Sequence, residues 1–257
     1  MSWSEFIYFA AGSLILWYSG TLALYKSKNA LWGNLLIAGG ILLFAAFIGL
    51  LWASMDHPPL RTMGETRLWY SLFIVLVGYA TYLRWKYKWL MAYSVVVSTV
   101  FVLVNLLKPE IHTTNLMPAL QSIWFVPHVT VYILSYAMMG AATIAALIAL
   151  WREEGKEGEL FALIDNLIFI GFGFLIAGML MGAIWAKEAW GDYWTWDPKE
   201  VWAFITAASY LVYLHASYAN IPKRKALLII PLAFIMLMIT WLGVEYLAVA
   251  QESIHSY

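Results

Sequence analysis

Long apolar runs, separated by short polar or charged segments, recur along the whole chain. Each run is about as long as a helix must be to cross the hydrocarbon core of a bilayer, which takes about 20 residues. The runs are continuous and do not alternate between apolar and polar residues, so they favour helices and exclude a β-barrel. We predict eight membrane-spanning helices, at residues 4–24, 31–52, 68–85, 89–107, 126–151, 161–185, 200–219 and 226–250.

The composition supports this prediction of an all-α, polytopic integral membrane protein. Hydrophobic residues make up 63% of the chain and charged residues 12%, which is about half the charged fraction of a soluble domain. A net charge of zero gives no reason to expect a nucleic-acid partner. The chain has no cysteine, which excludes disulfides, thiol chemistry and a Cys-x-x-Cys-His site for covalent haem attachment. The N-terminal segment lacks the features of a signal peptide, so residues 4–24 are expected to be a retained span.

The basic residues are distributed unequally between the two sides of the membrane. If the loop after the first span is cytoplasmic, most of them lie inside, as the positive-inside rule requires. Both termini are then predicted to lie outside. The inside set is Lys26, Lys28, Arg84, Lys86, Lys88, Arg152, Lys156, Lys223, Arg224 and Lys225, and the outside set is Arg61, Arg67, Lys108, Lys187 and Lys199.

This orientation separates the five histidines. His57 and His112 fall in outside loops, His128 begins the fifth span at the outer surface, and His255 follows the eighth span. His215 alone lies deep in a span, about 22 Å of helix rise from its outer end. An ionisable side chain at that depth indicates a function, although a histidine bonded to a neighbouring carbonyl is the alternative.

The stretch WGDYWTWDPKEVW, residues 190–202, gathers aromatic and charged residues in one outside loop. Tryptophan is enriched at membrane interfaces, so an interfacial belt is one reading of this loop. Its second half has the pattern of a helix start. Asp197 fits the N-cap, Pro198 the first helical position and Glu200 the reciprocal capping partner.

The first half of the stretch predicts a short amphipathic helix lying on the outer surface. Trp190, Tyr193 and Trp194 would share one face of it, opposite the more polar residues, although Gly191 weakens this prediction. Such a face would form an aromatic floor, with His128 and His255 on the same side of the membrane. Flat rings between two imidazoles suit a haem, because the macrocycle packs on aromatic surface and the iron takes axial nitrogens.

The stretch resembles the WWD signature of haem-handling proteins in cytochrome c maturation. The closer resemblance is to the CcsA (ResC) family of the System II pathway, whose signature continues with Trp-Asp-Pro-Lys-Glu into a helix ending Tyr-Leu-His. Here that helix reads VWAFITAASYLVYLH, and the likeness extends to VPHVTVYILSYAMMG, GMLMGAIWA and WLGVEYLAVAQESIHSY. The CcmC proteins of System I share the tryptophans but usually continue with an Arg-Leu-Thr run. The resemblance covers residues 124–257 well, as a WWD-type haem-handling core, and residues 1–123 loosely, as N-terminal transmembrane helices.

The resemblance also implies roles for the site residues. His128 and His255 align with the two axial ligands of an external haem, and His215 with a ligand of a second haem inside the membrane. No other histidine of this chain lies at that depth, so a separate CcsB (ResB)-like subunit is the expected source of the other ligand, ahead of a second copy of this chain. The residues of the motif that are expected to contact the external haem are Trp190, Trp194, Trp196 and Asp197.

These features together predict a membrane subunit of a cytochrome c haem lyase in the bacterial cytoplasmic membrane, with the tryptophan-rich loop on the periplasmic side. Haem b would be its cargo, carried from the cytoplasmic side and presented to the thiols of an apocytochrome Cys-x-x-Cys-His segment. The synthase would be formed together with the CcsB-like subunit. The alternatives are CcmC-like delivery of haem to a chaperone, a redox membrane cytochrome b, and a scaffold whose tryptophans serve only as a belt.

A few other residues carry weaker predictions. Gly178 and Gly182 form a small-xxx-small pair in the sixth span, which indicates close helix packing. Lys187 and Lys199 lie nearest the tryptophans and are interpreted as solvated loop charges ahead of partners for haem propionates. The role of Glu245 in the last span stays open between a salt bridge, a cap and a contact to a propionate.

Overall fold

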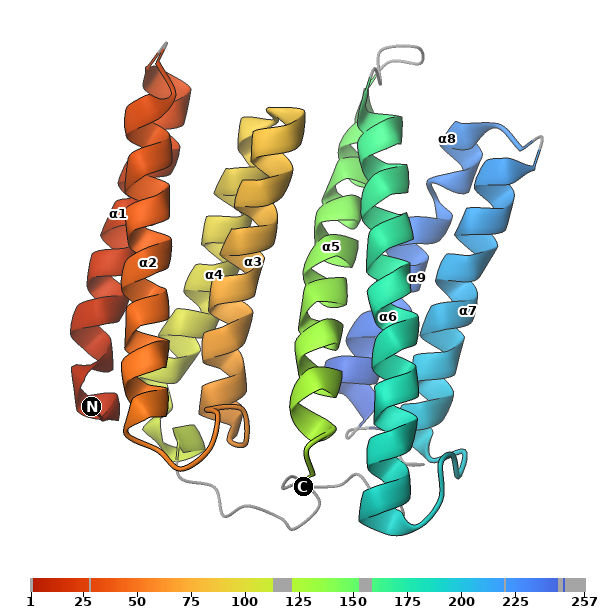
Figure 1. Cartoon of the computed structure of the whole chain (residues 1–257). Coiled ribbons are helices and arrows are strands. Elements are labelled where there is room, and N and C mark those ends of the chain that lie inside the picture. Colours follow the sequence, from red (N-terminus) through yellow and green to blue (C-terminus); the bar gives the residue numbers. More distant parts are fainter. Residues whose placement is uncertain are drawn as a thin grey trace. The chain divides into compact units, whose positions relative to one another are not determined.

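The structure is a computed structural model of the chain and describes residues 2–27, 29–112, 122–152, 159–219, 221–244 and 247. All regular elements among these residues are helical, which confirms the predicted all-α class. The chain divides into two compact units, Met1–Gln121 and Ser122–Tyr257, which we call unit 1 and unit 2 (Figure 1).

Unit 1 consists of the long helices α1 (Phe6–Lys26), α2 (Leu31–Ala53), α3 (Met63–Trp85) and α4 (Lys88–Leu107), with 3₁₀ turns at Trp3–Glu5 and Pro109–His112. Helix α1 packs on α2, α3 packs on α4, and α1 also contacts α4 (Figure 1). The rings of Trp17 and Phe44 are fully buried between α1 and α2, with centroids 5.4 Å apart. Gly40 makes room for the Trp17 ring, since a Cβ there would lie 2.7 Å from it.

The start of α3 is closed by a reciprocal pair of side-chain hydrogen bonds. The Thr62 hydroxyl accepts from the amide of Glu65 at 3.1 Å, and the Glu65 carboxylate accepts from the amides of Thr62 at 3.0 Å and Arg61 at 2.7 Å. This capping box satisfies amides that a helix start leaves without partners. At the same end of unit 1, His112 stacks on Trp3 with ring centroids 3.6 Å apart.

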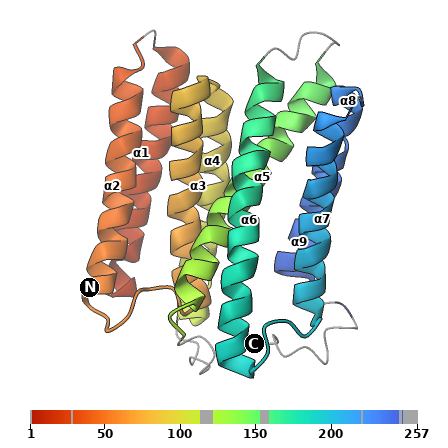
Figure 2. The ribbon, with the colours of Figure 1, turned by 45° about the vertical axis from the view of Figure 1, so that its right-hand side comes forward.

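Unit 2 consists of α5 (Phe125–Trp151), α6 (Leu160–Trp190), α7 (Pro198–Tyr218), α8 (Lys223–Ala226) and α9 (Ile229–Met238), followed by a π-helical turn at Ile239–Gly243. Helices α5 and α6 lie side by side, and α9 contacts both α5 and α7 (Figures 1 and 2). The buried face of α5 consists largely of small side chains, which let neighbouring helix backbones approach closely. The buried alanines are Ala141, Ala142, Ala145, Ala146 and Ala149.

A helix covers most of every predicted span, and the chain is a multi-pass membrane protein. Among the described residues, six helical stretches are both long and apolar enough to cross a bilayer. Helices α3 and α7 are long but less apolar and do not reach that threshold, so eight crossings and outside termini stay predictions. The last predicted span, residues 226–250, corresponds to the candidate span Lys223–Gly243. Within it, a turn at residues 227–228 separates α8 from α9, and a π-helical turn follows α9.

The π-helical turn is tied to α7 through one threonine. Thr240 Oγ1 lies 3.0 Å from the carbonyl oxygen of Trp202, 2.9 Å from the Thr206 hydroxyl and 2.8 Å from the carbonyl oxygen of Met236. The Thr240 hydroxyl thus connects the π-helical turn both to the preceding turn of α9 and to α7. The end of the last helix is thereby fixed beside the first turns of α7, close to the tryptophan stretch.

Candidate functional site

His128 lies in the first turn of α5 and faces α6. Its Nδ1 is 2.8 Å from the carbonyl oxygen of Gly178, and its ring stacks on Trp185 with centroids 5.6 Å apart and planes 27° apart. Tyr132, one turn further along α5, meets the same ring edge-on at 4.7 Å. The imidazole is therefore fixed in position and orientation by one hydrogen bond and two aromatic neighbours.

Two glycines of α6 make this approach possible. A Cβ at Gly182 would lie 2.7 Å from Cε1 of His128, and a Cβ at Gly178 would lie 3.0 Å from the Tyr132 ring. Side chains are not accommodated at such distances without a shift of the neighbour. The small-xxx-small pair thus serves close packing of α5 on α6, as predicted, and one of its members lies directly against the predicted ligand.

Trp190 ends α6 on the same side as His128. Its ring contacts Trp185 edge-on, with centroids 4.8 Å apart, so that His128, Trp185 and Trp190 form a continuous row. Gly191 follows with a positive φ of 94°, and its carbonyl accepts a hydrogen bond from Lys187 Nζ at 2.5 Å. This left-handed glycine ends the helix.

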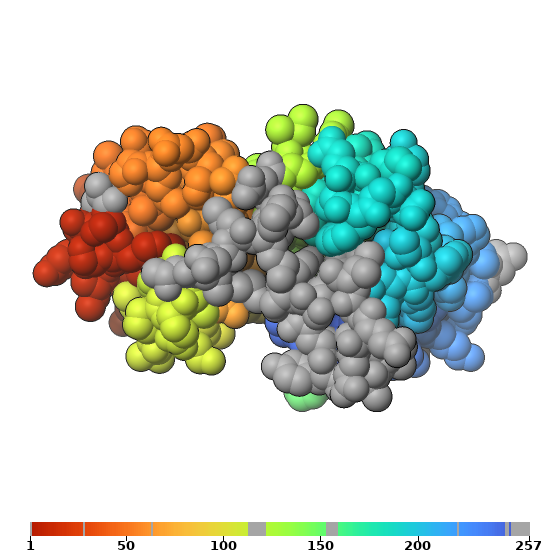
Figure 3. Space-filling view, turned by 90° about the horizontal axis from the view of Figure 1, so that it is seen from below, coloured from red at the N-terminus to blue at the C-terminus, as the bar shows by residue number. Residues whose placement is uncertain are grey.

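The predicted amphipathic helix after Trp190 is wrong, because residues 191–197 are not helical. Their chain is an irregular loop at the end of unit 2, and Figure 3 looks onto this end, with the cyan atoms of α6 and the loop at the surface. Tyr193 is exposed and its ring lies 5.4 Å from Lys187 Nζ, which therefore has aromatic and carbonyl partners in addition to solvent. The aromatic side chains of the stretch consequently do not share one helix face.

Trp194 and Trp196 meet edge-on in this loop, with ring centroids 5.8 Å apart. The Trp194 indole N–H is buried and has no hydrogen-bond partner among the described residues. Trp196 has a positive φ of 61°, is 65% exposed, and contacts Phe204 of α7 edge-on at 6.2 Å. The two rings therefore differ in environment, one partly buried and one turned outward.

The predicted start of α7 is confirmed. Asp197 is the N-cap and accepts a hydrogen bond from the amide of Lys199 at 3.0 Å, Pro198 is the first helical residue, and the Glu200 carboxylate accepts from the amide of Asp197 at 3.1 Å. Asp197 and Glu200 are both buried. Sequence reasoning found this arrangement because its signal lies within four consecutive residues.

His215 lies in the last turn of α7, on an exposed face. Its Nδ1 is 2.9 Å from the carbonyl oxygen of Leu211 in its own helix. Phe204, Leu211 and Tyr218 are exposed on the same side of α7 by helical spacing. The ring thus points away from the body of unit 2, and the described residues hold no cluster of three or more metal-binding His, Cys, Asp or Glu side chains.

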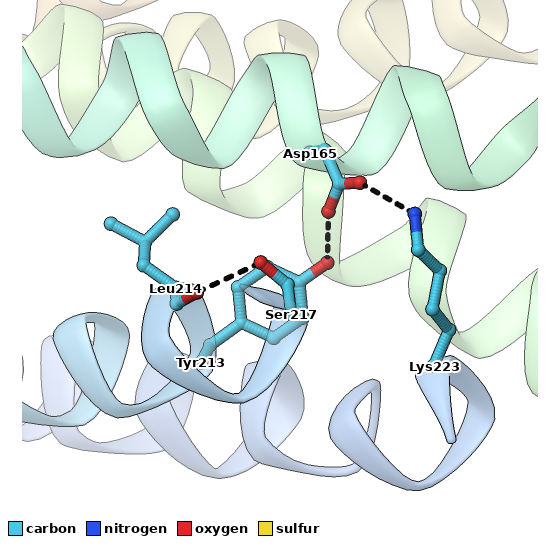
Figure 4. Close-up of polar contacts among 5 residues, drawn as sticks. All are labelled: Asp165, Tyr213, Leu214, Ser217 and Lys223. Atoms are coloured by element: carbon cyan, nitrogen blue, oxygen red, sulfur yellow. Dashed lines mark hydrogen bonds and ion pairs between the residues drawn. The ribbon is translucent and has the colours of Figure 1, made fainter. Parts of the chain in front are cut away.

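An acidic residue that sequence reasoning missed fixes the chain next to His215. Asp165 of α6 accepts a hydrogen bond from the Tyr213 hydroxyl at 2.7 Å and pairs with Lys223 of α8 at 3.2 Å (Figure 4). Arg224 donates to the carbonyl of Arg152 at 2.8 Å, which joins α8 to the end of α5. The available signal was an aspartate within a long apolar run, where an ionisable residue needs a partner.

The remaining candidates lie elsewhere or outside the described residues. His255 and Glu245 lie outside the described residues, so the predicted ligand role of His255 stays a prediction. His57 Nδ1 is 3.0 Å from the carbonyl oxygen of Pro58. His112 is stacked on Trp3, and partial burial lowers the pKa of its imidazole.

The fold and the site define a class: a polytopic helical membrane protein with a histidine and several tryptophans at one end of a helix bundle. The profile of the family described as "Cytochrome C assembly protein" matches residues 60–250. The match begins before α3, further upstream than the well-matching region 124–257 expected from motifs.

Proteins of similar sequence point to the same family. Proteins named "Cytochrome c biogenesis protein CcsA" are similar to this chain: that of Chlamydomonas reinhardtii is 33% identical over 80% of this chain and 62% of its own length. That of Coffea arabica is 31% identical over 93% of this chain and 87% of its own length. That of Panax ginseng is 33% identical over 85% of this chain and 84% of its own length. The chain belongs to the cytochrome c assembly family, and the predicted CcsA membership is confirmed. It is a membrane protein of cytochrome c biogenesis.

Proposed function

We propose that this chain binds haem where α5 begins and α6 ends, and presents it there for attachment to apocytochrome c. The observation that carries the proposal is the hydrogen bond between His128 Nδ1 and the Gly178 carbonyl. Because Nδ1–H donates to that carbonyl, the lone pair of the imidazole resides on Nε2. Histidines that bind metals commonly have their other ring nitrogen held in this way.

The surroundings of His128 suit a porphyrin. Trp185 and Trp190 continue the row of rings from the imidazole toward the end of α6. Aromatic surface packs against a macrocycle, and a second axial nitrogen completes the coordination of low-spin iron. We assign that second nitrogen to His255, whose motif match is the support for it.

Attachment requires that each cysteine thiol of the apocytochrome adds across a haem vinyl group, so that a C–S bond forms and the thiol proton is transferred to vinyl carbon. This chain has no cysteine, and both thiols belong to the substrate. The contribution of this chain is orientation of the reacting groups, which replaces a random encounter by a fixed geometry. The histidine of the incoming segment must displace one of the two imidazoles before haem can leave.

His215 is proposed to hold haem earlier on its route, on the cytoplasmic side of the membrane. Its ring is exposed on α7 rather than enclosed by unit 2, which supports coordination shared with another polypeptide. A CcsB-like subunit is the proposed partner. The excess of basic residues on the side of Lys223–Lys225 supports the corresponding orientation, with the tryptophan loop on the outer side of a bacterial cytoplasmic membrane.

A redox cytochrome b is less well supported. Such a protein needs pairs of histidines on facing helices at equal depth. His128 is in the first turn of α5, whereas His215 follows the start of α7 by 17 residues, or about 26 Å of helix rise. Because the start of α7 and the start of α5 lie at the same end of unit 2, the two imidazoles cannot ligate one iron.

Absorption spectroscopy of the purified chain tests the proposal. The wild-type protein should show a low-spin spectrum typical of two histidine ligands. His128→Ala and His255→Ala should each lower haem content or give a high-spin spectrum, and free imidazole should partly restore the low-spin form by filling the vacant axial position. An unchanged low-spin spectrum in both variants would disprove the ligand assignment, and a wild-type protein without haem absorption would disprove haem binding.

A further inference from the structure

The Glu200 carboxylate makes more contacts than a capping box requires. Its Oε2 accepts from the amide of Asp197 at 3.1 Å, as such a box prescribes, and also from the amide of Thr195 at 2.7 Å. The Thr195 hydroxyl lies 3.4 Å from the same oxygen. Glu200 is 9% exposed, so these hydrogen bonds are sheltered from water and retain most of their strength.

The two amides that share this oxygen flank Trp196. Both N–H groups point at one acceptor, an arrangement that a left-handed residue between them produces. Trp196 accordingly has a φ of 61°. The left-handed region is unfavourable for a bulky side chain, and a residue persists there only where its surroundings determine the backbone.

Packing of the Trp196 ring does not explain this conformation. The ring is 65% exposed, and its contacts to Trp194 and Phe204 are edge-on at 5.8 Å and 6.2 Å. A ring that buries about a third of its surface gains only about as much as a left-handed backbone costs, so packing alone does not fix this turn. The two hydrogen bonds to Glu200 supply the additional stabilisation that holds the loop in this form, with a large aromatic ring mostly outside.

We infer that Glu200 is a positioning residue, whose carboxylate sets the left-handed turn at Trp196 and so presents the indole ring for contact with the haem macrocycle. This inference rests on the proposed function, and it assigns Glu200 a role beyond the start of α7. An interfacial belt would need no such device, because a tryptophan reaches the headgroup region from an unstrained backbone.

Glu65 offers a matched control within the same chain. It closes the start of α3 with the same reciprocal arrangement and also accepts from an amide before the N-cap, that of Arg61. Glu65→Gln therefore removes the same kind of carboxylate from a capping box in unit 1 and leaves the tryptophan loop unchanged. Glu200→Gln keeps the shape of the side chain but replaces the charged acceptor by a weaker neutral one.

Hydroxyl-radical footprinting with mass spectrometry tests the positioning step without haem. In the full-length protein in lipid nanodiscs, Glu200→Gln should lower the labelling of Trp196 several-fold, because the loop relaxes and the ring settles against the protein or lipid. Glu65→Gln should leave that labelling at the wild-type level. Unchanged labelling in Glu200→Gln, or an equal fall in both variants, would overturn the inference.

Haem content, measured on the same preparations, tests the contact with the macrocycle. Glu200→Gln should lower haem per protein several-fold in the wild-type background and have little further effect in a Trp196→Ala background, since interacting residues show non-additive changes. Equal losses in both backgrounds would overturn an action through Trp196. If wild-type protein holds no haem, the proposed function and the haem contact fail together, while the labelling experiment still decides whether Glu200 positions Trp196.

Discussion

His128 and Gly182 meet across the α5–α6 interface so closely that a single added methyl group would not fit between them. A Cβ at position 182 would lie 2.7 Å from Cε1 and 2.8 Å from Nδ1 of the imidazole. The imidazole is also bonded to the Gly178 carbonyl. A substitution on α6 can therefore displace the predicted ligand without changing any atom of the histidine.

Gly182→Ala is the corresponding prediction. The methyl group should push the His128 ring away from the Gly178 carbonyl and release the fixed tautomer, so haem content should fall or the spectrum should turn high-spin. Absorption spectroscopy measures this directly. Gly173→Ala is the control, because a Cβ at that position of α6 has nothing within 4 Å. A normal low-spin spectrum in Gly182→Ala would show that the close approach has no bearing on coordination.

Trp196→Gly should lower haem binding with little net change in stability. Glycine adopts positive φ without a steric penalty, which gains about 1 kcal/mol. Loss of the ring, about a third of which is buried, costs a similar amount. Haem retention should fall because the outward ring is lost. Thermal unfolding and haem content of one preparation measure both effects, and a loss of stability as large as that of a buried tryptophan would contradict the assignment of strain.

His215→Ala should leave the protein folded. Among the described residues, the ring of His215 has one hydrogen bond, to the Leu211 carbonyl of the same helix, so the melting temperature should stay near that of the wild type. In a preparation that also contains a CcsB-like partner, this variant should lose one low-spin haem. Tyr218→Phe, on the same exposed side of α7, should retain it. A purified wild-type monomer that already carries two fully ligated haems would contradict the role of His215.

Unit 1 should lose stability as the pH falls below about 6.5, the ordinary pKa of histidine. Burial against Trp3 lowers the pKa of His112, partly opposed by a hydrogen bond to the Asn105 backbone and by the nearby charge of Glu110. The unfolded chain then binds more protons than the folded one in this range, so stability rises with pH. The stability that comes from neutral His112 is fully present above about pH 6.5, the pKa of histidine in the unfolded chain. It is lost as the pH falls toward the lowered pKa of His112 in the folded protein.

His112→Phe isolates this effect, because phenylalanine keeps a ring stacked on Trp3 but cannot titrate. Melting curves at about pH 7.5 and about pH 5.5 should differ less in His112→Phe than in the wild type. An equal pH dependence in both proteins would assign the effect to other groups.

Helix positions were predictable from the sequence because length and apolar content decide them in a membrane. The start of α7 was predictable to the residue, since Asp197, Pro198 and Glu200 carry their signal locally. The helix expected after Trp190 failed because the left-handed Gly191 ends α6, and a helical wheel contains no information about such a residue.

The details of the candidate site depend on contacts between distant parts of the chain. His128 and Gly178 are 50 residues apart, and no local pattern reveals that the imidazole reaches that carbonyl. The pairing of Asp165 with Tyr213 spans 48 residues and was missed for the same reason. The second hydrogen bond of Glu200, to Thr195, was missed although it is local, because it accompanies a left-handed tryptophan that propensity does not predict.

The capping boxes of α3 and α7 have a consequence for how the chain enters the membrane during synthesis. These two long helices are less apolar than the six candidate spans, so each alone would partition weakly from the translocon into lipid. Each is followed by a strongly apolar stretch, Lys88–Leu107 after α3 and Lys223–Gly243 after α7. The carboxylates of Glu65 and Glu200 accept hydrogen bonds from backbone amides that would otherwise enter the membrane interface without partners. For the predicted crossings of α3 and α7, this arrangement favours entry as helical hairpins, in which the more apolar second helix carries the first into the membrane.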